Sequence, residues 1–588
     1  MKLAKVLVAV IESLCIMPVA SKQGIERVQD IREKNQWSLQ NLADRAQIHV
    51  DTLQRMVSGD SVARDTIRSI ARTLGLEVTD IVPPEEWSPR KVFISTYREA
   101  PDFDYAQELG SCLKDHGLRV SIATNSGADR LREYDYFVLL LSSQAAISEI
   151  VTEEVGKAKR LLNYKRSPTI LSIHIGSAGL LNHDLQVHLE EINQWEWRSG
   201  NPSTLATAVL TLMAGDQPSE CLVPTDLLPP GPDPDSSKQD KPYPNPEPPG
   251  GQVRIGSAFY VERPQVESTC YQEILQPGAL IRIKAPRQMG KTSLMARILH
   301  YAGENGCHTV PFSLQQVANQ NFTNSDEFLK AFCTNIGEKQ SLLDRFDECW
   351  NNIVDSNQKT TNYFEKHLLA QTASPLVIGL DEVDLIFQNR EISNDFMGLL
   401  RAWYEKARYG DRSSEIWEKL RLVVVHSTEA YIPMDINQSP FNVGLAFDLP
   451  EFNQEQVQDL AQRHRLSCGT NQVQQLMDLV GGHPHLVRLA LYQIACENLT
   501  LDQLLQEATT EAGPYSDHLR RHLWSLEQHP ELAAALSRVV TANQPIELES
   551  ELAFKLQSMG LVKMEGNHVQ PSCNLYLQYF RERLRFTS

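Results

Sequence analysis

The sequence predicts a multidomain α/β protein with two separate parallel-sheet regions. Three observations support this fold class. The chain has 588 residues, more than one hydrophobic core normally organises. Apolar strand-like runs alternate with helical patterns in two regions, which is typical of parallel sheets covered by helices. A proline-rich segment at 217–251 separates these regions and predicts an extended linker, since proline cannot donate backbone hydrogen bonds.

These changes of pattern place the expected domain boundaries. The segments are an N-terminal stretch 1–24, a helical domain 25–84, a first α/β domain 88–215, the linker 216–252, a second α/β core 253–450, a helical subdomain 451–525 and a C-terminal domain 526–588.

Composition limits the classes of function. The net charge of −18 argues against a protein that coats nucleic acid or anionic membranes, although one local module can still contact DNA. The ten cysteines include no C-x-x-C pair and form no metal-like cluster with histidine. We therefore expect reduced thiols in the cytoplasm, no disulfide framework and no zinc site.

No segment approaches the roughly 20 apolar residues of a membrane span, so no membrane partner is expected. Lys2 and Lys5 precede a short apolar run, which superficially resembles an export signal, but Glu12 interrupts it. An amphipathic first helix or a misassigned start is favoured instead.

Residues 25–82 have the pattern of consecutive short helices. Ser38 is a favourable N-cap for one of them, and Asp51–Met56 follows it after a turn. The segment resembles the Cro/repressor-type helix-turn-helix family, which implies DNA as a partner and places 51–56 on the recognition helix. The residues implied as contacts to bases or phosphates are Thr52, Gln54 and Arg55. Because the module is nearly neutral, a protein-interaction bundle of the same fold stays open.

Residues 91–215 change to alternating strands and helices. The expected strands are 92–95, 119–122, 137–143 and 169–173, and the expected helices are 105–116 and 150–161. At Phe93-Ile94-Ser95 and again at 141–155 this segment resembles TIR domains. The resemblance implies a flavodoxin-like fold.

The resemblance to TIR domains also implies a candidate enzymatic residue. In members that are enzymes, a glutamate of the second motif helps to cleave NAD⁺ at its glycosidic bond, and Glu154 matches it, with Ser148 six residues earlier. A carboxylate there can stabilise the ribosyl cation that forms as nicotinamide leaves, so NAD⁺ is a candidate substrate. The link from Ile122 to Phe137 is shorter than is usual in the family. The alternative is that Glu154 is one of several solvated charges on its helix.

The segment 285–293 predicts a phosphate-binding loop. It follows an apolar strand at 279–283 and precedes a helical pattern, which is the context this motif needs. Backbone N–H groups face the anion, Lys291 neutralises the terminal phosphates of ATP, and Thr292 reaches Mg²⁺. Ala285 replaces the usual first glycine, so the turn must enter through a conformation that alanine tolerates. The residues of this cofactor site are Ala285, Pro286, Arg287, Gln288, Met289, Gly290, Lys291, Thr292 and Ser293.

A second motif supplies the acidic partner of a phosphate loop. An apolar strand ends at Asp381 and Glu382, so we expect Asp381 to hold Mg²⁺ and Glu382 to polarise the attacking water as a catalytic residue. Another apolar strand, 422–425, ends in Ser427 and Thr428. Either is a candidate sensor of the γ-phosphate, and a simple strand-end cap is equally open.

Residues 256–497 resemble the AAA-like ATPases of the STAND class, signal-transducing NTPases with numerous domains, and most closely a branch common in cyanobacteria. In that branch a G-x-P motif places its proline against adenine, which implies this role for Pro484 in Gly482-His483-Pro484. Phe259–Arg263 is expected to supply one wall of the same pocket. A winged helix usually follows, and Glu531–Arg581 fits one.

No clear arginine finger emerges, and the candidates are Arg390, Arg401 and Arg408. The C-terminal repeat sensor of such proteins is not expected after the winged helix.

The resemblances together imply a cytoplasmic switch that binds ATP or ADP with Mg²⁺ and forms a nucleotide-dependent homo-oligomer, in defence or stress signalling. Three outputs stay open. Clustered TIR-like domains consume NAD⁺; the helix-turn-helix makes the chain an ATP-gated transcription regulator; or the TIR-like domain is a scaffold without enzymatic activity.

Overall fold

The computed structural model describes most of the chain. The described residues are 19–60, 62, 64–83, 90–123, 128–165, 167–176, 181–198, 202–213, 221–225, 245–317, 319–339, 350, 355–411, 414–427, 443–496 and 499–584. The apolar N-terminal run, the boundary at 84–87, the centre of the proline-rich segment and Thr428 lie outside them. The chain divides into two compact units, 1–181 with 185–233, and 182–184 with 234–588.

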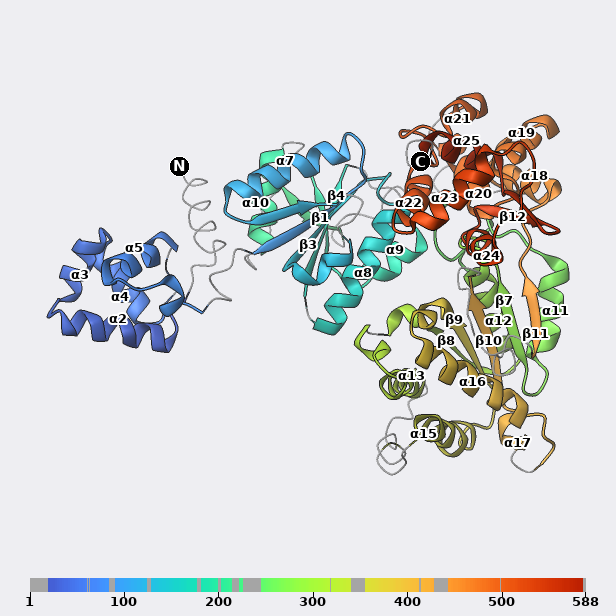
Figure 1. Ribbon diagram of the computed structural model, residues 1–588, viewed down its shortest axis with the longest axis horizontal. Helices are drawn as coiled ribbons and strands as arrows, with labels where there is room; N and C mark the ends of the chain where they lie inside the picture. The colour runs from blue at the N-terminus through green and yellow to red at the C-terminus, as the bar shows by residue number, and fades with distance from the viewer. Residues whose placement is uncertain are drawn as a thin grey trace. The chain divides into compact units, whose positions relative to one another are not determined.

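A bundle of short helices forms the first part of unit 1 (Figure 1). Its helices are α2 (Lys22–Lys34), α3 (Leu39–Ala46), α4 (Val50–Val57), α5 (Arg64–Leu74) and the 3-10 turn η1 (Val78–Asp80). As expected, Ser38 caps α3, in a reciprocal capping box with Asn41. Gln47 adopts a left-handed conformation that ends α3 and turns the chain toward α4. Leu53 and Met56 are fully buried, so they fix one face of α4 to the bundle.

The remainder of unit 1 contains a six-stranded sheet with the order β2-β1-β3-β4-β5-β6. Its strands are β1 (Lys91–Ser95), β2 (Arg119–Ile122), β3 (Tyr136–Leu141), β4 (Thr169–Ile175), β5 (Gln194–Trp197) and β6 (Leu222–Pro224). All pairs are parallel except β5–β6. The expected strands are therefore present. The sequence did not indicate β5, and β6 falls in the segment that we expected to be linker.

Helices cover both faces of this sheet, as the apolar strands predicted. The helices are α7 (Asp102–Asp115), α8 (Glu149–Lys165), α9 (His183–Leu189), α10 (Pro202–Met213) and the 3-10 turn η2 (Ala128–Glu133). Side chains of α7 and α10 pack in one apolar core, and those of α8 and α9 pack in the other. The strand order 2-1-3-4-5 is that of flavodoxin-like doubly wound sheets.

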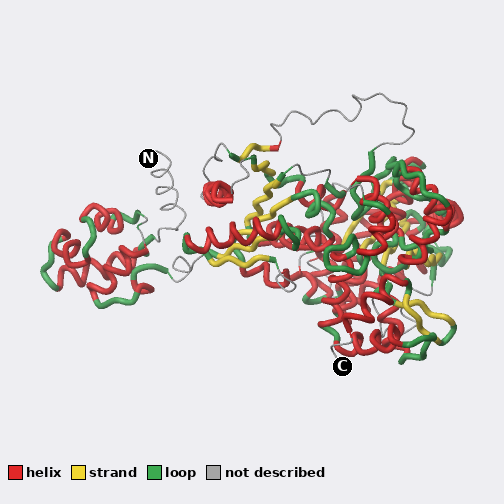
Figure 2. The backbone as a smooth tube through the Cα atoms, turned by 90° about the horizontal axis from the view of Figure 1, so that it is seen from above, coloured by secondary structure: helices red, strands yellow, loops and turns green. Residues whose placement is uncertain are grey.

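Unit 2 contains a five-stranded sheet with the order β11-β7-β10-β9-β8, in which every pair is parallel. Its strands are β7 (Leu280–Lys284), β8 (His308–Ser313), β9 (Leu376–Asp381), β10 (Leu420–His426) and β11 (Leu445–Asp448). Figure 2 shows these strands enclosed by helices. The helices are α11 (Pro264–Ile274), α12 (Lys291–Glu304), α13 (Ser325–Lys339), α15 (Ser356–Tyr363), α16 (Arg390–Lys406) and α17 (Ser414–Trp417), with short turns η4 (Leu314–Gln316), η5 (Asn319–Phe322), η7 (Phe364–Leu369) and η8 (Val383–Gln388).

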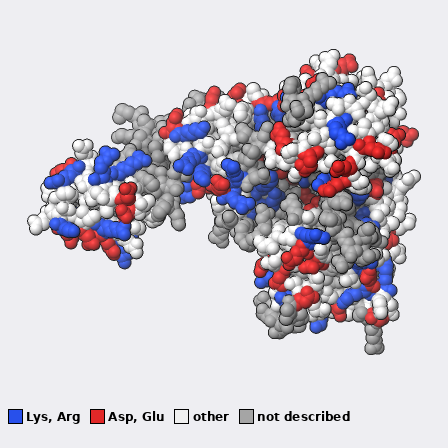
Figure 3. Space-filling model, viewed as in Figure 1, with Lys and Arg blue, Asp and Glu red and all other residues white. Residues whose placement is uncertain are grey.

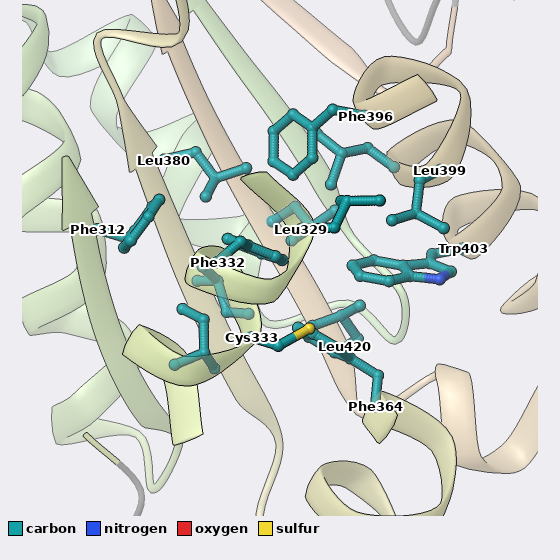
Figure 4. Close-up of a cluster of buried hydrophobic side chains, with 14 of the residues drawn as sticks. Phe312, Leu329, Phe332, Cys333, Phe364, Leu380, Phe396, Leu399, Trp403 and Leu420 are labelled. Carbon is teal, nitrogen blue, oxygen red and sulfur yellow. The ribbon is translucent and has the colours of Figure 1, made fainter. Parts of the chain in front are cut away.

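Alternation along the buried strands explains why two apolar cores flank this sheet. Leu376, Ile378 and Leu380 of β9 join a cluster with α13, α15 and α16, whereas Val377 joins the cluster of α11 and α12. Figure 4 shows aromatic rings of the first cluster, including Trp403 of α16, gathered beside β9. Such aromatic contacts stabilise the packing of these helices on the sheet.

The C-terminal third of unit 2 is mainly helical (Figure 1). The helical subdomain contains α18 (Gln454–Arg463), α19 (Thr470–Val480), α20 (Pro484–Cys496), α21 (Leu501–Glu507) and α22 (Ser516–Glu527). The C-terminal module contains α23 (Pro530–Thr541), α24 (Ser550–Ser558), β12 (Val562–Glu565), β13 (His568–Pro571) and α25 (Asn574–Arg583). β12 and β13 form the antiparallel hairpin expected around 565–567.

Candidate phosphate-binding site

The predicted phosphate loop and acidic motif meet at one edge of the unit 2 sheet. Strand β7 leads into the loop, strand β9 ends at Asp381, and β10 lies between the two strands. Because the strands are parallel, their carboxyl ends share this edge, where ligands of open α/β sheets bind. Sequence spacing alone did not show that β10 separates the two motifs.

The left-handed residues of the phosphate loop lie near its C-terminal end and not at Ala285. Gly290 has φ of 93° and Gln288 has φ of 62°, while Ala285 is not among the described residues with positive φ. Gly290 precedes the first residue of α12, so a left-handed conformation is required where the helix begins. The expectation that alanine is tolerated at 285 therefore agrees with the backbone.

Lys291 reaches back over the loop. Its ammonium donates hydrogen bonds to the carbonyl oxygens of Ala285 at 2.9 Å and of Pro286 at 2.8 Å. Other residues of the loop differ in exposure: Met289 and Ser293 are buried, and Arg287 is exposed. The Ser293 hydroxyl accepts from the backbone N–H of Val253. The loop thus presents one cation at the start of a helix, an arrangement suited to an anion.

Thr292 and Asp381 are in direct contact. The threonine hydroxyl donates to Oδ2 of Asp381 at 2.7 Å, and Oδ1 accepts from the backbone N–H of Glu382 at 2.9 Å. Asp381 is 6% exposed, and burial raises the pKa of its carboxyl. A hydroxyl and a carboxylate side by side are the oxygen ligands that Mg²⁺ prefers, so the residues present fit this metal ion.

Glu382 is held by two residues that the sequence did not indicate. Its Oε2 accepts from the Ser313 hydroxyl at 3.1 Å, and its Oε1 accepts from the side-chain amide of Gln315. Glu382 also has a left-handed backbone with φ of 54°. Strand β8, which delivers Ser313 to this edge, contains Pro311, and proline weakens a strand pattern.

Ser427 lies where β10 leaves the sheet, between the loop and the acidic motif. Its backbone N–H donates to Oδ2 of Asp384 at 2.7 Å, which ties it to the segment after Glu382. Ser427 is 4% exposed, and its hydroxyl has no hydrogen-bond partner among the described residues. The hydroxyl therefore does not act as the strand-end cap that we considered.

Arg263 connects the phosphate loop to the chain that leaves β11. Its guanidinium donates to the carbonyl of Met289 at 3.0 Å and to that of Pro450 at 3.2 Å, and it stacks over Phe452 at 4.8 Å. Glu267 fixes its position by accepting from the Arg263 backbone N–H at 2.8 Å. The sequence predicted only that Phe259–Arg263 forms a pocket wall. It did not indicate these contacts, because Met289 and Pro450 are remote from Arg263 in the sequence.

The G-x-P motif, Gly482-His483-Pro484, is hydrogen-bonded to the same segment that follows β11. Gly482 accepts from the backbone N–H of Phe452 at 2.8 Å, and a Cβ at 482 would lie 2.0 Å from the Phe452 carbonyl oxygen. Only glycine permits this approach. Pro484, which is buried, then begins α20. Contacts through Phe452 and Arg263 thus lead from Pro484 to the phosphate loop.

The arginine-finger candidates occupy different surroundings. Arg390 is exposed at the start of α16. Arg401 pairs with Glu405 on the same helix at 2.8 Å. Arg408 donates to the carbonyl of Gly278 at 2.8 Å, before β7 and therefore at the opposite edge of the sheet from the phosphate loop.

Glu154 is buried in unit 1. It is 2% exposed, Oε2 accepts from the Ser95 hydroxyl at 2.6 Å, and Oε1 pairs with Arg98 at 2.7 Å. The alternative that Glu154 is a solvated charge is therefore wrong, because the carboxylate joins α8 to the end of β1. Ser148 is 3% exposed and its hydroxyl accepts from the backbone N–H of Val151, as an N-cap does.

The predicted DNA contacts all lie on α4. Gln54 and Arg55 are exposed, and Thr52 is half-buried. In Figure 3 the visible face of this bundle, at the left as in Figure 1, carries both basic and acidic side chains rather than a continuous basic surface. A face of mixed charge such as this one attracts phosphates only weakly.

A family model described as an AAA-like domain matches residues 248–582, more than half of the chain. The chain belongs to this AAA-like family. The AAA-like domain includes both sheet-edge motifs, the helical subdomain and nearly all of the C-terminal module. A model described as a Cro/C1-type HTH DNA-binding domain matches residues 27–85. No curated protein matches the chain.

Solved structures similar to the chain include ATPases and replication initiators. The Walker-type ATPase paby2304 of Pyrococcus abyssi is 13% identical with a TM-score of 0.41, covering 56% of this chain and 98% of its own. Cdc6p of Pyrobaculum aerophilum is 15% identical with a TM-score of 0.28, covering 57% and 100%. AMPPCP-bound DnaA of Aquifex aeolicus is 12% identical with a TM-score of 0.27, covering 50% and 75%. At scores below 0.5 these likenesses assign no residue or activity.

No helix among the described residues is both long and apolar enough to cross a membrane.

Proposed function

We propose that the chain is an ATP-hydrolysing switch of the STAND type, in which the nucleotide state of the AAA-like domain controls the N-terminal domains. The contact between Thr292 and Asp381 carries this proposal, because it places the end of the phosphate loop against the acidic end of β9. The family match supports a nucleotide-binding domain but not this mode of signalling.

The roles that we assign follow from the atoms at the sheet edge. Lys291 binds the terminal phosphates in place of the two loop carbonyls that it now contacts. Thr292 and Asp381 hold Mg²⁺, which would neutralise phosphate charge when bound. The Ser427 hydroxyl, buried between the motifs, reports the γ-phosphate.

Glu382 is the proposed base that orients the attacking water. Both of its oxygens now accept hydrogen bonds, from Ser313 and Gln315, and such bonds stabilise the carboxylate and weaken it as a base. Loss of either hydrogen bond would make Glu382 a stronger base. The two bonds therefore fit a slow switch better than a rapid ATPase.

The nucleotide state reaches the C-terminal module, which we propose to be a winged helix, through two contacts. A Cβ at Gly560, which follows α24, would lie 3.1 Å from the Pro286 side chain of the phosphate loop. On α25, the Asn574 amide donates to the carbonyl of Asp478 in α19 at 2.7 Å. A loop that rearranges around phosphates would press on Gly560 and shift the module.

ATP hydrolysis by the purified full chain tests the enzymatic part. We expect slow, Mg²⁺-dependent phosphate release that Glu382→Gln removes while nucleotide binding remains. Lys291→Ala is expected to weaken binding itself. Absence of hydrolysis at every Mg²⁺ and nucleotide concentration would leave only a nucleotide sensor.

Regulated DNA binding by α4 is the proposed output, because the helix-turn-helix match gives it independent support. Capture of genomic fragments at physiological salt, in ADP and in a non-hydrolysable ATP analogue, tests it. We expect fragments to be enriched in one nucleotide state, and Gln54→Ala to relax their sequence preference. Mass measurement in the same two states tests the proposed oligomerisation.

We propose a TIR-like fold for residues 88–215 on the basis of its strand order, with a scaffolding role rather than NAD⁺ hydrolysis. The occupied and buried carboxylate of Glu154 favours the scaffold. Release of nicotinamide from NAD⁺ by the full chain in any nucleotide state, lost in Glu154→Gln, would restore the enzymatic alternative.

A further inference from the structure

Residues 245–260, hereafter the strap, lead from the proline-rich segment into the AAA-like core and belong to unit 2. The sequence predicted an extended linker as far as residue 252, but Pro248 and Pro249 are buried. The strap contains turns and no helix or strand, so side chains of other elements bind several of its backbone groups. These side chains come from two parts of unit 2, the phosphate-loop helix α12 and the helical subdomain.

The middle of the strap is hydrogen-bonded to the beginning of α12. The backbone N–H of Val253 donates to the Ser293 hydroxyl at 2.9 Å, and Ser293 directly follows Thr292. Arg297, one turn later, donates to the carbonyls of Val253 and Arg254, both at 3.0 Å. The strap therefore supports the turn of α12 that carries the proposed Mg²⁺ ligand Thr292.

Arginines of the helical subdomain bind both ends of the same strap. Arg465, just after α18, donates to Oδ1 of Asn245 at 2.9 Å. Arg463, the last residue of α18, donates to the carbonyls of Ala258 at 2.9 Å and Tyr260 at 2.6 Å. Because one short segment is bonded to α12 and to α18, the helical subdomain cannot move away from α12 without breaking contacts of the strap.

Glu247 and Arg488 form an ion pair between the strap and α20. Nη2 of Arg488 lies 3.6 Å from Oε2 of Glu247, and the Ser257 hydroxyl donates to the same oxygen at 2.7 Å. Arg488 is 8% exposed, and burial lowers the pKa of its guanidinium to about 10, so the group is still charged near neutral pH. Among the described residues Glu247 is the one carboxylate that pairs with it, so detachment of Glu247 leaves a buried charge without a counterion.

We propose that the Glu247–Arg488 pair fastens the strap, and that the fastened strap slows nucleotide release by keeping α12 and the helical subdomain on one segment. Arg488 is a positioning residue, since it acts on the phosphate loop through the strap and α12. This role rests on the proposed binding of nucleotide at that loop. Detachment of Glu247 would speed exchange of ADP for ATP. Because the strap ends the segment that leads from the N-terminal domains, a change in those domains can reach the nucleotide site along the chain.

Dissociation of a fluorescent ADP analogue from the full chain, chased with unlabelled ADP, tests the proposal. Glu247→Gln removes the charge and keeps the size of the side chain. Because the Glu247 side chain is 37% exposed, water replaces part of the interaction, so we expect dissociation to be about 3- to 10-fold faster. Glu455→Gln, the same change at an exposed position in the first turn of α18, is the matched control and should stay within about 1.5-fold of wild type.

Hydrogen exchange separates detachment of the strap from general unfolding. In Glu247→Gln a peptide spanning 250–260 should exchange faster, while a peptide from the buried strand β9 keeps its wild-type protection. Ser257→Ala removes the hydroxyl that donates to Glu247 and should speed ADP dissociation about 2- to 5-fold. Combined with Glu247→Gln it should add little, because both changes act on one contact.

A folded Glu247→Gln chain whose ADP dissociation rate stays within about 1.5-fold of wild type overturns the proposal, whether or not the strap exchanges faster. If Glu247→Gln does not fold, the rate in Ser257→Ala decides by the same limit. A wild-type chain that binds neither ADP nor ATP would instead overturn the proposed nucleotide-binding function, and this role with it.

Discussion

Replacing Arg263 with methionine separates positioning of the phosphate loop from phosphate binding itself. Methionine keeps much of the length and apolar contact of arginine but removes the two hydrogen bonds to the carbonyls of Met289 and Pro450. Arg263 is 5% exposed, and burial lowers the pKa of its guanidinium, so the charge is held in a poorly hydrated place. The hydrogen bonds to these two carbonyls therefore replace the hydration that the guanidinium loses on burial.

The magnitude follows from the bond to the loop. A hydrogen bond from a charged donor contributes about 1.5–3 kcal/mol, and its loss lets the Met289 carbonyl leave its position. If the loop then reaches the binding conformation only at that free-energy cost, the apparent Kd for nucleotide rises about 10- to 100-fold. The bond to Pro450 affects the helical subdomain instead, so its loss should lower the midpoint of thermal unfolding.

Titration of fluorescent ATP and ADP analogues into the wild-type chain and Arg263→Met measures this effect. Arg538→Met removes an exposed arginine from α23 and should change Kd by less than about 2-fold, since surface charges contribute little. If folded Arg263→Met binds nucleotide within about 3-fold of wild type, Arg263 does not position the loop.

Three further substitutions address separate features. Gln315→Ala removes one hydrogen bond from Glu382. Because such a bond contributes about 1 kcal/mol, kcat should rise about 5- to 10-fold in a phosphate-release assay. A fall in kcat would mean that Gln315 positions the base productively. Gln288→Gly relieves a left-handed residue in the loop and should stabilise unit 2 by about 1 kcal/mol in urea unfolding; destabilisation would contradict this. Burial lowers the pKa of His464 from 6.5 to about 4, so the unfolded chain takes up a proton at higher pH than the folded chain does. The free energy of unfolding therefore falls as the pH drops from 6.5 toward 4. His464→Gln should remove about 3 kcal/mol of that loss, and an unchanged pH profile of stability would contradict this.

The nucleotide site was predictable where its chemistry is local in the sequence. Lys291 and Thr292 follow an apolar strand and open a helix, and Asp381 ends another buried strand, so each motif carries its own structural context. Parallel pairing then brings the strand ends together, and the Thr292–Asp381 contact confirms that the motifs meet. Alanine at position 285, in place of the usual glycine, is compatible with this prediction, because the left-handed residues come later in the loop.

The rest depends on contacts between residues that no local pattern connects. Ser313 ends β8, whose strand pattern is weakened by Pro311, and its contact with Glu382 requires β8 to lie beside β9. Arg263 acts through backbone carbonyls, which have no sequence signature. Glu247 and Arg488 share no motif and pair only because the strap packs against α20.

The structure shows what surrounds Glu154 but does not give it a catalytic role. The motif drew attention to a glutamate on α8, and in the structure that carboxylate holds Ser95 and Arg98 at the carboxyl end of β1. The end of β1 beside β3 is where a sheet of this strand order binds ligands. A carboxylate whose two oxygens are both engaged, and which is 2% exposed, must break a buried ion pair before it can meet a sugar ring. Removing one partner of a buried pair costs about 3–5 kcal/mol, so catalysis would need a ligand that replaces Arg98. The same pair serves a scaffold without any such cost, because it fixes the loop after β1 against α8.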